Sequence, residues 1–179
     1  MKERSIKHDL DVEGKAFNDG DRAEKSFAER FFKKFGVYPK RTDEYRDKYE
    51  HIDYEADIRG HKGTWDVKAI KRLERNDADY MYDRVWVEFV SKGFLGWLYG
   101  KADWIAFELE KDGEFVCVRR QALLEFCQEH CEPIFVESPK EAMWGMYVRK
   151  YKLEDGSRTV DIMSLIDRDV LFCLENWKL

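Results

Sequence analysis

The chain has 179 residues, of which 44% are apolar and 39% are charged, and its formal net charge is −5 at pH 7. This length fits one domain that buries about two thirds of its unfolded surface, and the acidic balance argues against a protein coated with positive charge for indiscriminate nucleic-acid binding. No apolar run approaches the roughly eighteen residues of a membrane span, and the opening MKERSIKHDLDVEGK lacks an apolar signal core. We therefore expect a cytoplasmic protein with no membrane partner.

The first predicted element is a helix over residues 15–35, KAFNDGDRAEKSFAERFFKKF, which ends at Gly36. Strand patterns follow at residues 51–58 and 63–70. After the charged loop KRLERNDADYMYD, apolar alternation predicts three further strands, at residues 84–90, 103–109 and 114–118.

A second helix is predicted at residues 119–131, followed by a hairpin that turns at EDG and a short helix near residues 164–174. The order of elements predicts a single α/β (α+β) domain over residues 1–179, in which a mixed central β-sheet is flanked by helices. Its core covers residues 15–131, and residues 132–179 form a C-terminal appendage.

The stretch HIDYEADIRGHKGTWDVKAIKR, residues 51–72, gathers acidic side chains on one face of the predicted hairpin. Side chains alternate across a strand, so Asp53, Glu55 and Asp57 share one face, and the apolar residues between them face the core. A hairpin built only for stability has no need of three acids on one face, so this pattern indicates a binding function.

The second strand of this hairpin places Asp66 and Lys68 on one face. A two-residue turn with Gly60 in its first position would put Asp53 opposite Lys68 and Glu55 opposite Asp66. Carboxylates and an ammonium group would then converge, since opposed Cβ atoms lie about 5 Å apart. The alternative is a plain ion-paired hairpin with a cross-strand salt bridge between Asp53 and Lys68.

Crowded carboxylates raise each other's pKa unless a cation intervenes, and a divalent metal is the natural cation. Oxygen ligands suit Mg²⁺ or Mn²⁺, which keep positions open for a phosphate oxygen. Asp53, Asp66 and the backbone carbonyl of Val67 supply such a ligand set, and Lys68 would lie beside a metal-activated water. Asp57 is the rival to Asp53, because it shares the same face closer to the turn.

Glu24 lies in the middle of the apolar stripe of the first predicted helix. At about 100° per residue, five apolar residues fall within about 60° of its direction: Phe17, Phe27, Ala28, Phe31 and Phe35. A glutamate on a buried face is costly unless something compensates it. A hydrogen bond to a Trp, Tyr or Arg would do so, and so would the metal of the neighbouring hairpin.

Asp53, followed thirteen residues later by the tripeptide DVK that begins at Asp66, resembles the core motif of the PD-(D/E)XK nuclease superfamily. The pieces here are HIDY and DVK, with Ile52 in place of the proline of the family name. The order helix, strand, strand agrees with that superfamily over about residues 15–130. The segment VWVEFVSKGFLGWLYGKADWIAFE also resembles a stretch in phage and bacterial relatives.

The resemblance implies a restriction-endonuclease-like core and a Mg²⁺-dependent endodeoxyribonuclease, which hydrolyses phosphodiester bonds of DNA. It makes Asp53 and Asp66 metal ligands, Lys68 the catalytic lysine and Glu24 the helix acid near the metal. Duplex or branched DNA is the implied partner. Many relatives dimerise to cut two strands, so a homodimer stands beside a monomer as an open alternative.

Further charged residues flank this motif. Glu88 lies on a strand face with apolar neighbours and is an additional candidate for the site, with a structural glutamate as the alternative. Lys71, Arg72 and Arg75 follow the catalytic strand and are candidates for phosphate contacts, with ordinary solvated charge as the alternative.

The cysteines do not have the density of a disulfide framework, so we expect four free thiols: Cys117, Cys127, Cys131 and Cys173. Cys127, His130 and Cys131 are spaced closely enough to suggest zinc. They overlap a helical pattern, however, and the missing partner pair favours core packing.

Two other functions compete with a nuclease. One is a nucleic-acid-binding or regulatory protein that keeps the nuclease fold without cutting. The other is an interaction protein whose charged hairpin is only a surface. DNA binding without metal-dependent cleavage would favour the first, and the absence of both Mn²⁺ and DNA binding would favour the second.

Overall fold

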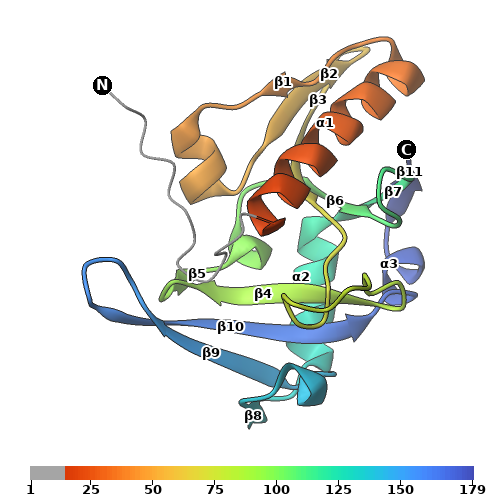
Figure 1. The fold of residues 1–179 in the computed structure, drawn as a ribbon. Helices are drawn as coiled ribbons and strands as arrows, with labels where there is room; N and C mark the ends of the chain where they lie inside the picture. Colours follow the sequence, from red (N-terminus) through yellow and green to blue (C-terminus); the bar gives the residue numbers. More distant parts are fainter. Residues whose placement is uncertain (1–14) are drawn as a thin grey trace.

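The computed structural model describes residues 15–179, with side chains from Asn18 onward, as an α/β fold with two mixed sheets (Figure 1). The larger sheet has the strand order β1-β2-β3-β6-β7-β11, in which β3 and β6 run parallel and the other neighbours antiparallel. Its strands are β1 (Lys40–Arg41), β2 (Tyr54–Ile58), β3 (His61–Lys68), β6 (Trp104–Glu108), β7 (Phe115–Arg119) and β11 (Asn176–Lys178).

The second sheet has the order β5-β4-β10-β9-β8, with β8 parallel to β9. Its strands are β4 (Arg84–Ser91), β5 (Phe94–Leu95), β8 (Phe135–Val136), β9 (Met146–Lys152) and β10 (Arg158–Asp167). The sequence predicted one central sheet, but β4 leaves that sheet and pairs with β10. Alternation alone identifies a strand and not the sheet that it joins, which explains the difference.

The helical segments are few. The helices are α1 (Lys15–Phe35), α2 (Arg120–His130) and α3 (Val170–Cys173), and short turns of other helix types are η1 (Arg46–Glu50), η2 (Trp97–Tyr99) and η3 (Pro139–Glu141). Gly36 ends α1 as predicted: its φ is 71°, and its N–H donates to the Phe32 carbonyl at 2.8 Å. Within residues 15–179, no helix is both long and apolar enough to cross a membrane.

The apolar stripe of α1 packs on one face of the larger sheet. Phe27 and Phe31 are completely buried, and their rings lie 6.4 and 5.0 Å from that of Trp65. Glu29 on the other side of α1 is exposed. These placements confirm the predicted stripe, apart from Phe17, whose side chain lies outside the described residues.

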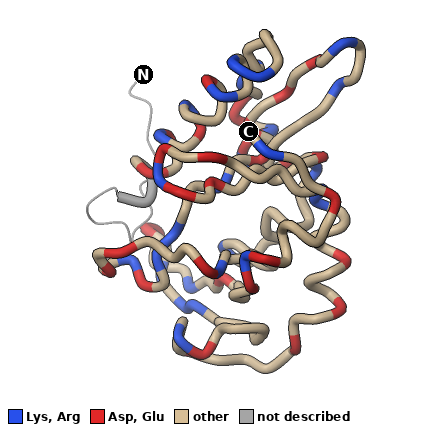
Figure 2. The backbone as a smooth tube through the Cα atoms, turned by 90° about the vertical axis from the view of Figure 1, so that its right-hand side faces the viewer, with Lys and Arg blue, Asp and Glu red and all other residues tan. Residues whose placement is uncertain are grey.

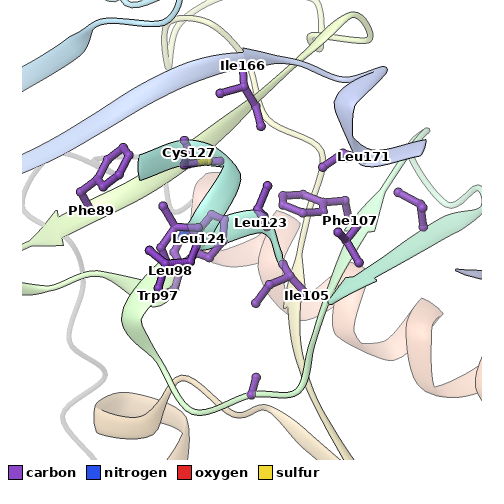
Figure 3. Packing of buried hydrophobic residues seen from close by; sticks show 14 of the residues in the cluster. Phe89, Trp97, Leu98, Ile105, Phe107, Leu123, Leu124, Cys127, Ile166 and Leu171 are labelled. Carbon is purple, nitrogen blue, oxygen red and sulfur yellow. The ribbon is translucent and has the colours of Figure 1, made fainter. Parts of the chain in front are cut away.

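The opposite face of the larger sheet turns toward the second sheet, and we call it the inter-sheet face. The core between the sheets combines Ile105 and Phe107 of β6 with Val87 of β4 and with Leu123 and Cys127 of α2 (Figure 3). Cys127 is therefore a core residue, and all four cysteines are free thiols. Helix α2 and η2 both contribute to this core, the latter through Trp97 and Leu98.

The β2–β3 hairpin turns at Arg59-Gly60, with φ values of 54° and 86°, and not one residue later as predicted. Both values match a type I′ turn, whose twist suits a hairpin. Tyr54 consequently pairs with Trp65, and Glu55 with Thr64. The predicted register, with Asp53 opposite Lys68 and Glu55 opposite Asp66, is wrong.

Residues 132–179 contribute to both sheets. Strand β10 pairs with β4 and β9, and β11 pairs with β7. The helix predicted near residues 164–174 is wrong over most of its length, because β10 continues to Asp167 and only Val170–Cys173 is helical. A short apolar run satisfies a buried strand as well as a helix, which explains the error.

Candidate functional site

Two buried aspartates lie side by side where β2 begins. Asp53 directly precedes β2 and Asp66 lies near the end of β3, and they are 8% and 2% exposed. The Asp53 N–H donates to the Trp65 carbonyl at 2.9 Å, and Asp53 Oδ2 accepts the Val67 N–H at 2.6 Å. Because Trp65 and Val67 pack toward α1, Asp66 between them points to the inter-sheet face.

Both carboxyl groups resist ionisation. Burial raises the pKa of Asp53 well above its ordinary value, and the charge of Asp66 raises it further. Burial also raises the pKa of Asp66, although Lys68 and a hydrogen bond with Asp53 oppose that shift. A bond between two carboxyl groups needs a proton on one of them. When both are ionised, Asp66 Oδ2 has no hydrogen-bond partner among the described residues, so the pair calls for a cation.

Lys68 supplies one positive charge to this pair. Its Nζ lies 2.6 Å from Asp66 Oδ1 and 5.2 Å from the centre of the Trp97 ring. Burial lowers the pKa of Lys68, but the charges of Asp66 and Asp53 outweigh burial and the pKa is raised overall. With 23% of its side chain exposed, Lys68 remains reachable from solvent. One ammonium group against two carboxylates leaves the site net negative.

Glu24 approaches the aspartates from the α1 side of the sheet. Its side chain is 16% exposed, and Oε2 lies 2.7 Å from Arg41 Nη2. Burial and the charge of Asp53 raise the pKa of Glu24 to about 7, partly offset by Arg41. The same oxygen makes no hydrogen bond of normal geometry among the described residues, so the contact with Arg41 is ionic. Glu24 and Asp53 therefore interact only through their charges, whereas Arg41 is the ion-pair partner of Glu24.

Glu88 reaches the site from β4 of the second sheet. Burial raises its pKa, and the charge of Lys68 lowers it, which places the two side chains within electrostatic range. A Cβ on Gly96 would lie 2.5 Å from the Glu88 carbonyl oxygen and 2.9 Å from its Cγ. Only glycine lets η2, which carries Trp97, pack this closely against Glu88.

Asp57 and Glu55 lie away from the aspartate pair. Asp57 is an exposed residue of β2 next to the hairpin turn, where its Oδ1 accepts the Gly60 N–H at 2.6 Å. Glu55 pairs with Arg46 of η1. The structure therefore brings Asp53, and not Asp57, beside the aspartate of β3.

The three basic residues after β3 have different surroundings. Lys71 is exposed on one side, but the protein atoms around it and the charge of Lys68 lower its pKa. Arg72 Nη1 bonds Asp19 Oδ2 at 3.0 Å, and its guanidinium lies 4.1 Å from the ring of a tyrosine in the same loop. Arg75 is half-buried, and its charge also acts on Lys71. Lys71 is the member of the group whose pKa the charge of Lys68 affects.

Sequence reasoning missed three neighbours of the site. Trp97 lies beside Lys68, Arg41 pairs with Glu24, and His51 ends η1 with a φ of 53°. Burial and the charge of Lys68 lower the pKa of His51. The correct hairpin turn would have placed His51 opposite Lys68. The run GWLYG suggests a tight segment, but nothing in the sequence indicates where it packs.

The residues present fit a hard divalent cation. In the described part of the chain, no three His, Cys, Asp or Glu side chains gather into a metal site by themselves. Mg²⁺, however, commonly uses one or two carboxylates and keeps several waters. Asp53, Asp66 and the Val67 carbonyl would supply that oxygen set, and in the ionised pair Asp66 Oδ2 accepts no hydrogen bond from a described residue. These donors suit Mg²⁺ or Mn²⁺ better than zinc, which prefers nitrogen and sulfur.

Two surface cavities of the described structure lie elsewhere. One of about 460 Å³ includes Phe126, Trp144 and Cys173 in its lining, and one of about 620 Å³ follows the exposed side of α1. Comparison of the chain with protein-family models, with curated proteins and with solved structures found no match.

Proposed function

We propose that the protein is a metal-dependent nuclease with a restriction-endonuclease-like core, which hydrolyses phosphodiester bonds of DNA. The observation that carries the proposal is the adjacency of Asp53 and Asp66, both buried, with Lys68 Nζ 2.6 Å from Asp66. Helix α1 precedes the β2–β3 hairpin, with the two-residue β1 and η1 between them, and the order helix, strand, strand is that of the PD-(D/E)XK superfamily. Support comes from these residues and their arrangement alone.

Burial of Asp53 and Asp66 costs folding free energy, and a function of the two carboxylates would explain why the protein retains them. Each carboxylate loses hydration, and their mutual repulsion adds to that loss. The Lys68–Asp66 ion pair offsets part of the cost but leaves Asp53 with a single backbone donor, the Val67 N–H. A plain structural salt bridge would need one carboxylate, so the second favours a cation-binding role.

Each residue has a definite part in the proposed reaction. Asp53, Asp66 and the carbonyl of Val67 would hold the ion, and the Val67 N–H keeps the Asp53 carboxyl group oriented. A bound Mg²⁺ or Mn²⁺ supplies Lewis-acid chemistry, since it polarises a phosphoryl oxygen and lowers the pKa of water. The ammonium group of Lys68 stabilises the negative charge that develops on the phosphate. Glu24, whose pKa is about 7, can hold a proton beside Asp53 at neutral pH.

The test is cleavage of plasmid and of branched DNA with Mg²⁺ or Mn²⁺. Asp66→Ala and Lys68→Ala should abolish cleavage, while Asp57→Ala, which changes an exposed aspartate of the same hairpin, should retain it. Mn²⁺ should raise the melting temperature of the wild type and leave that of Asp66→Ala unchanged. Equal cleavage by all four proteins would overturn the assignment of the site.

One observation favours a second candidate function. Among the described residues, no third carboxylate completes a preformed metal cluster with Asp53 and Asp66. A protein that binds nucleic acid without cutting it would retain this fold and the Lys68–Asp66 ion pair. DNA binding in a gel shift, with no metal-dependent cleavage of any substrate form, would distinguish that candidate from the nuclease.

A further inference from the structure

Arg149 of β9 is held by a buried acid of the neighbouring strand. Asp161 of β10 is 2% exposed and pairs with Arg149 in the sheet register. Its Oδ2 accepts hydrogen bonds from Arg149 Nε, at 3.1 Å, and from Nη2. Its Oδ1 accepts the Tyr151 hydroxyl at 3.0 Å and the Lys92 N–H at 2.8 Å. The carboxylate is thus fully engaged, and it fixes one edge of the guanidinium group.

The other edge of the Arg149 guanidinium is available. Nη1 donates to no acceptor within the described residues, and 24% of the side chain is exposed. A guanidinium presents donors in a planar fork that matches phosphate oxygens. Because Asp161 already restrains the side chain, a phosphate that binds Nη1 would cost little further ordering.

The sheet face that carries Arg149 also carries Glu88, whose charge acts on Asp66 and Lys68. Glu88 pairs with Met163, and Met163 lies two residues from Asp161, so these side chains share one face. Arg149 and Lys68 both lower the pKa of Glu88, and the contact of Glu88 with Gly96 ties the same strand to η2. Arg149 and Lys68 therefore approach Glu88 from different sheets.

Lys71 adds a cation to this face. It makes no ion pair with a described acid, and it acts on Glu88 as Lys68 and Arg149 do. The Trp86 indole lies on the same face as Glu88 and donates a hydrogen bond to the Arg72 carbonyl at 3.2 Å. This bond holds the segment that contains Lys71 against the second sheet. The charges of Lys68, Arg149 and Lys71 thus all lower the pKa of Glu88, and the charge of Asp161 opposes them.

Lys and Arg are interspersed with Asp and Glu along the chain, and the net charge is −5 (Figure 2). A polyanion would gain little from the surface as a whole, so affinity would depend on a few placed cations. A cation restrained by a buried acid is such a group.

We propose that Arg149 binds a backbone phosphate of the nucleic acid that flanks the phosphate cleaved at Asp53 and Asp66, with Asp161 as its positioning residue. The proposal rests on the proposed function, because it takes its ligand to be the substrate of that site. The substrate would cross from the β2–β3 hairpin to the face of the second sheet, past Lys71. This gives residues 146–167 a part in substrate binding.

Fluorescence anisotropy with a short labelled DNA duplex in EDTA reads binding without cleavage. Arg149→Lys keeps a charge for Asp161 and removes the fork. The double variant Arg149→Gln with Asp161→Asn removes the guanidinium without leaving a lone buried carboxylate. It provides the test of the inference if Arg149→Lys does not fold. Lys150→Gln is the matched control, because Lys150 lies on the opposite face of β9 and is 69% exposed. Cleavage with Mg²⁺ is measured in parallel.

Each Arg149 variant should bind about ten-fold more weakly, and the double variant should lower the slope of log K against log salt by about one. Lys150→Gln should change affinity by no more than about two-fold. If the wild type cuts DNA and the Arg149 variants bind as the control does, the inference alone is overturned. If the wild type binds through Arg149 but does not cut, the proposed nuclease alone is overturned. If it neither binds nor cuts, both are overturned.

Discussion

Lys68 Nζ lies 2.6 Å from Asp66 Oδ1, and a second buried aspartate, Asp53, lies beside Asp66 just before the neighbouring strand β2. Burial raises the pKa of both carboxyl groups above the ordinary value. The ammonium group of Lys68 compensates part of their negative charge when they are ionised. A carboxyl group with a raised pKa binds its proton more tightly in the folded than in the unfolded state. Its contribution to stability therefore falls as the pH rises from the ordinary pKa toward the folded one.

Removal of the Lys68 ammonium should destabilise the protein, and more so at high pH. Lys68→Ala leaves the aspartates without a cation, and loss of one partner of a buried pair costs about 3–5 kcal/mol. At pH 5 the cost should be smaller, because protonation can neutralise one of the two carboxyl groups. Urea unfolding of the metal-free protein at pH 5 and pH 8 measures the difference. Lys62→Ala is the control, since Lys62 is an exposed residue of the same strand and should change stability by less than about 0.5 kcal/mol.

An equal loss of stability at both pH values would contradict this account, because it would mean that the aspartates do not titrate with Lys68. A Lys68→Ala protein as stable as Lys62→Ala would show that one of the carboxyl groups is already protonated in the wild type at pH 8.

The order of elements was predictable where periodicity is strong. The α1 stripe, the β2–β3 hairpin and α2 follow from spacing of apolar residues, and all three are present. The partition into two sheets was not predictable, because β4 and β10 meet across a long sequence separation. Alternation specifies which face of a strand is buried, while its partner depends on packing that local sequence does not encode.

The candidate site was predictable in its members and not in its register. Asp53, Asp66 and Lys68 share a face by alternation, and the structure brings them together. The turn was misplaced because Gly60 suits either central position of a two-residue turn, and the observed turn holds Arg59 at a φ of 54°. An arginine in that conformation is unfavourable by local rules, so tertiary packing of the strands determined the register.

Glu24 should make stability depend on pH in a window separate from acid denaturation. Its pKa is raised from 4.5 to about 7, so its ionised form opposes folding, and stability should fall as the pH rises through that range. Glu24→Gln removes the titration. Relative to the wild type, the variant should be more stable at pH 8 by about 1–3 kcal/mol and nearly equal at pH 5. Urea unfolding at the two pH values checks this.

Glu29→Gln is the matched control for Glu24, because it makes the same substitution on the exposed side of α1. It should leave the pH dependence of the wild type unchanged. A Glu24→Gln variant that loses stability at pH 8 would show that the ion pair with Arg41 outweighs burial, and the direction of the Glu24 shift would then be wrong.

Two glycine-to-alanine substitutions should have opposite effects. A Cβ on Gly96 would meet the Glu88 carbonyl oxygen at 2.5 Å and its carbonyl carbon at 2.8 Å, and these backbone atoms cannot move aside without separating β4 from η2. Gly96→Ala should therefore cost about 1–3 kcal/mol, although the φ of −75° at Gly96 suits any residue. Gly20 lies within α1 with nothing near its Cβ position, so Gly20→Ala should stabilise the protein by about 0.5–1 kcal/mol.

Thermal unfolding of both variants measures the contrast. If Gly96→Ala is as harmless as Gly20→Ala, then η2 does not pack on β4 in solution, and Glu88 loses the contact that holds its strand beside Trp97 and Lys68.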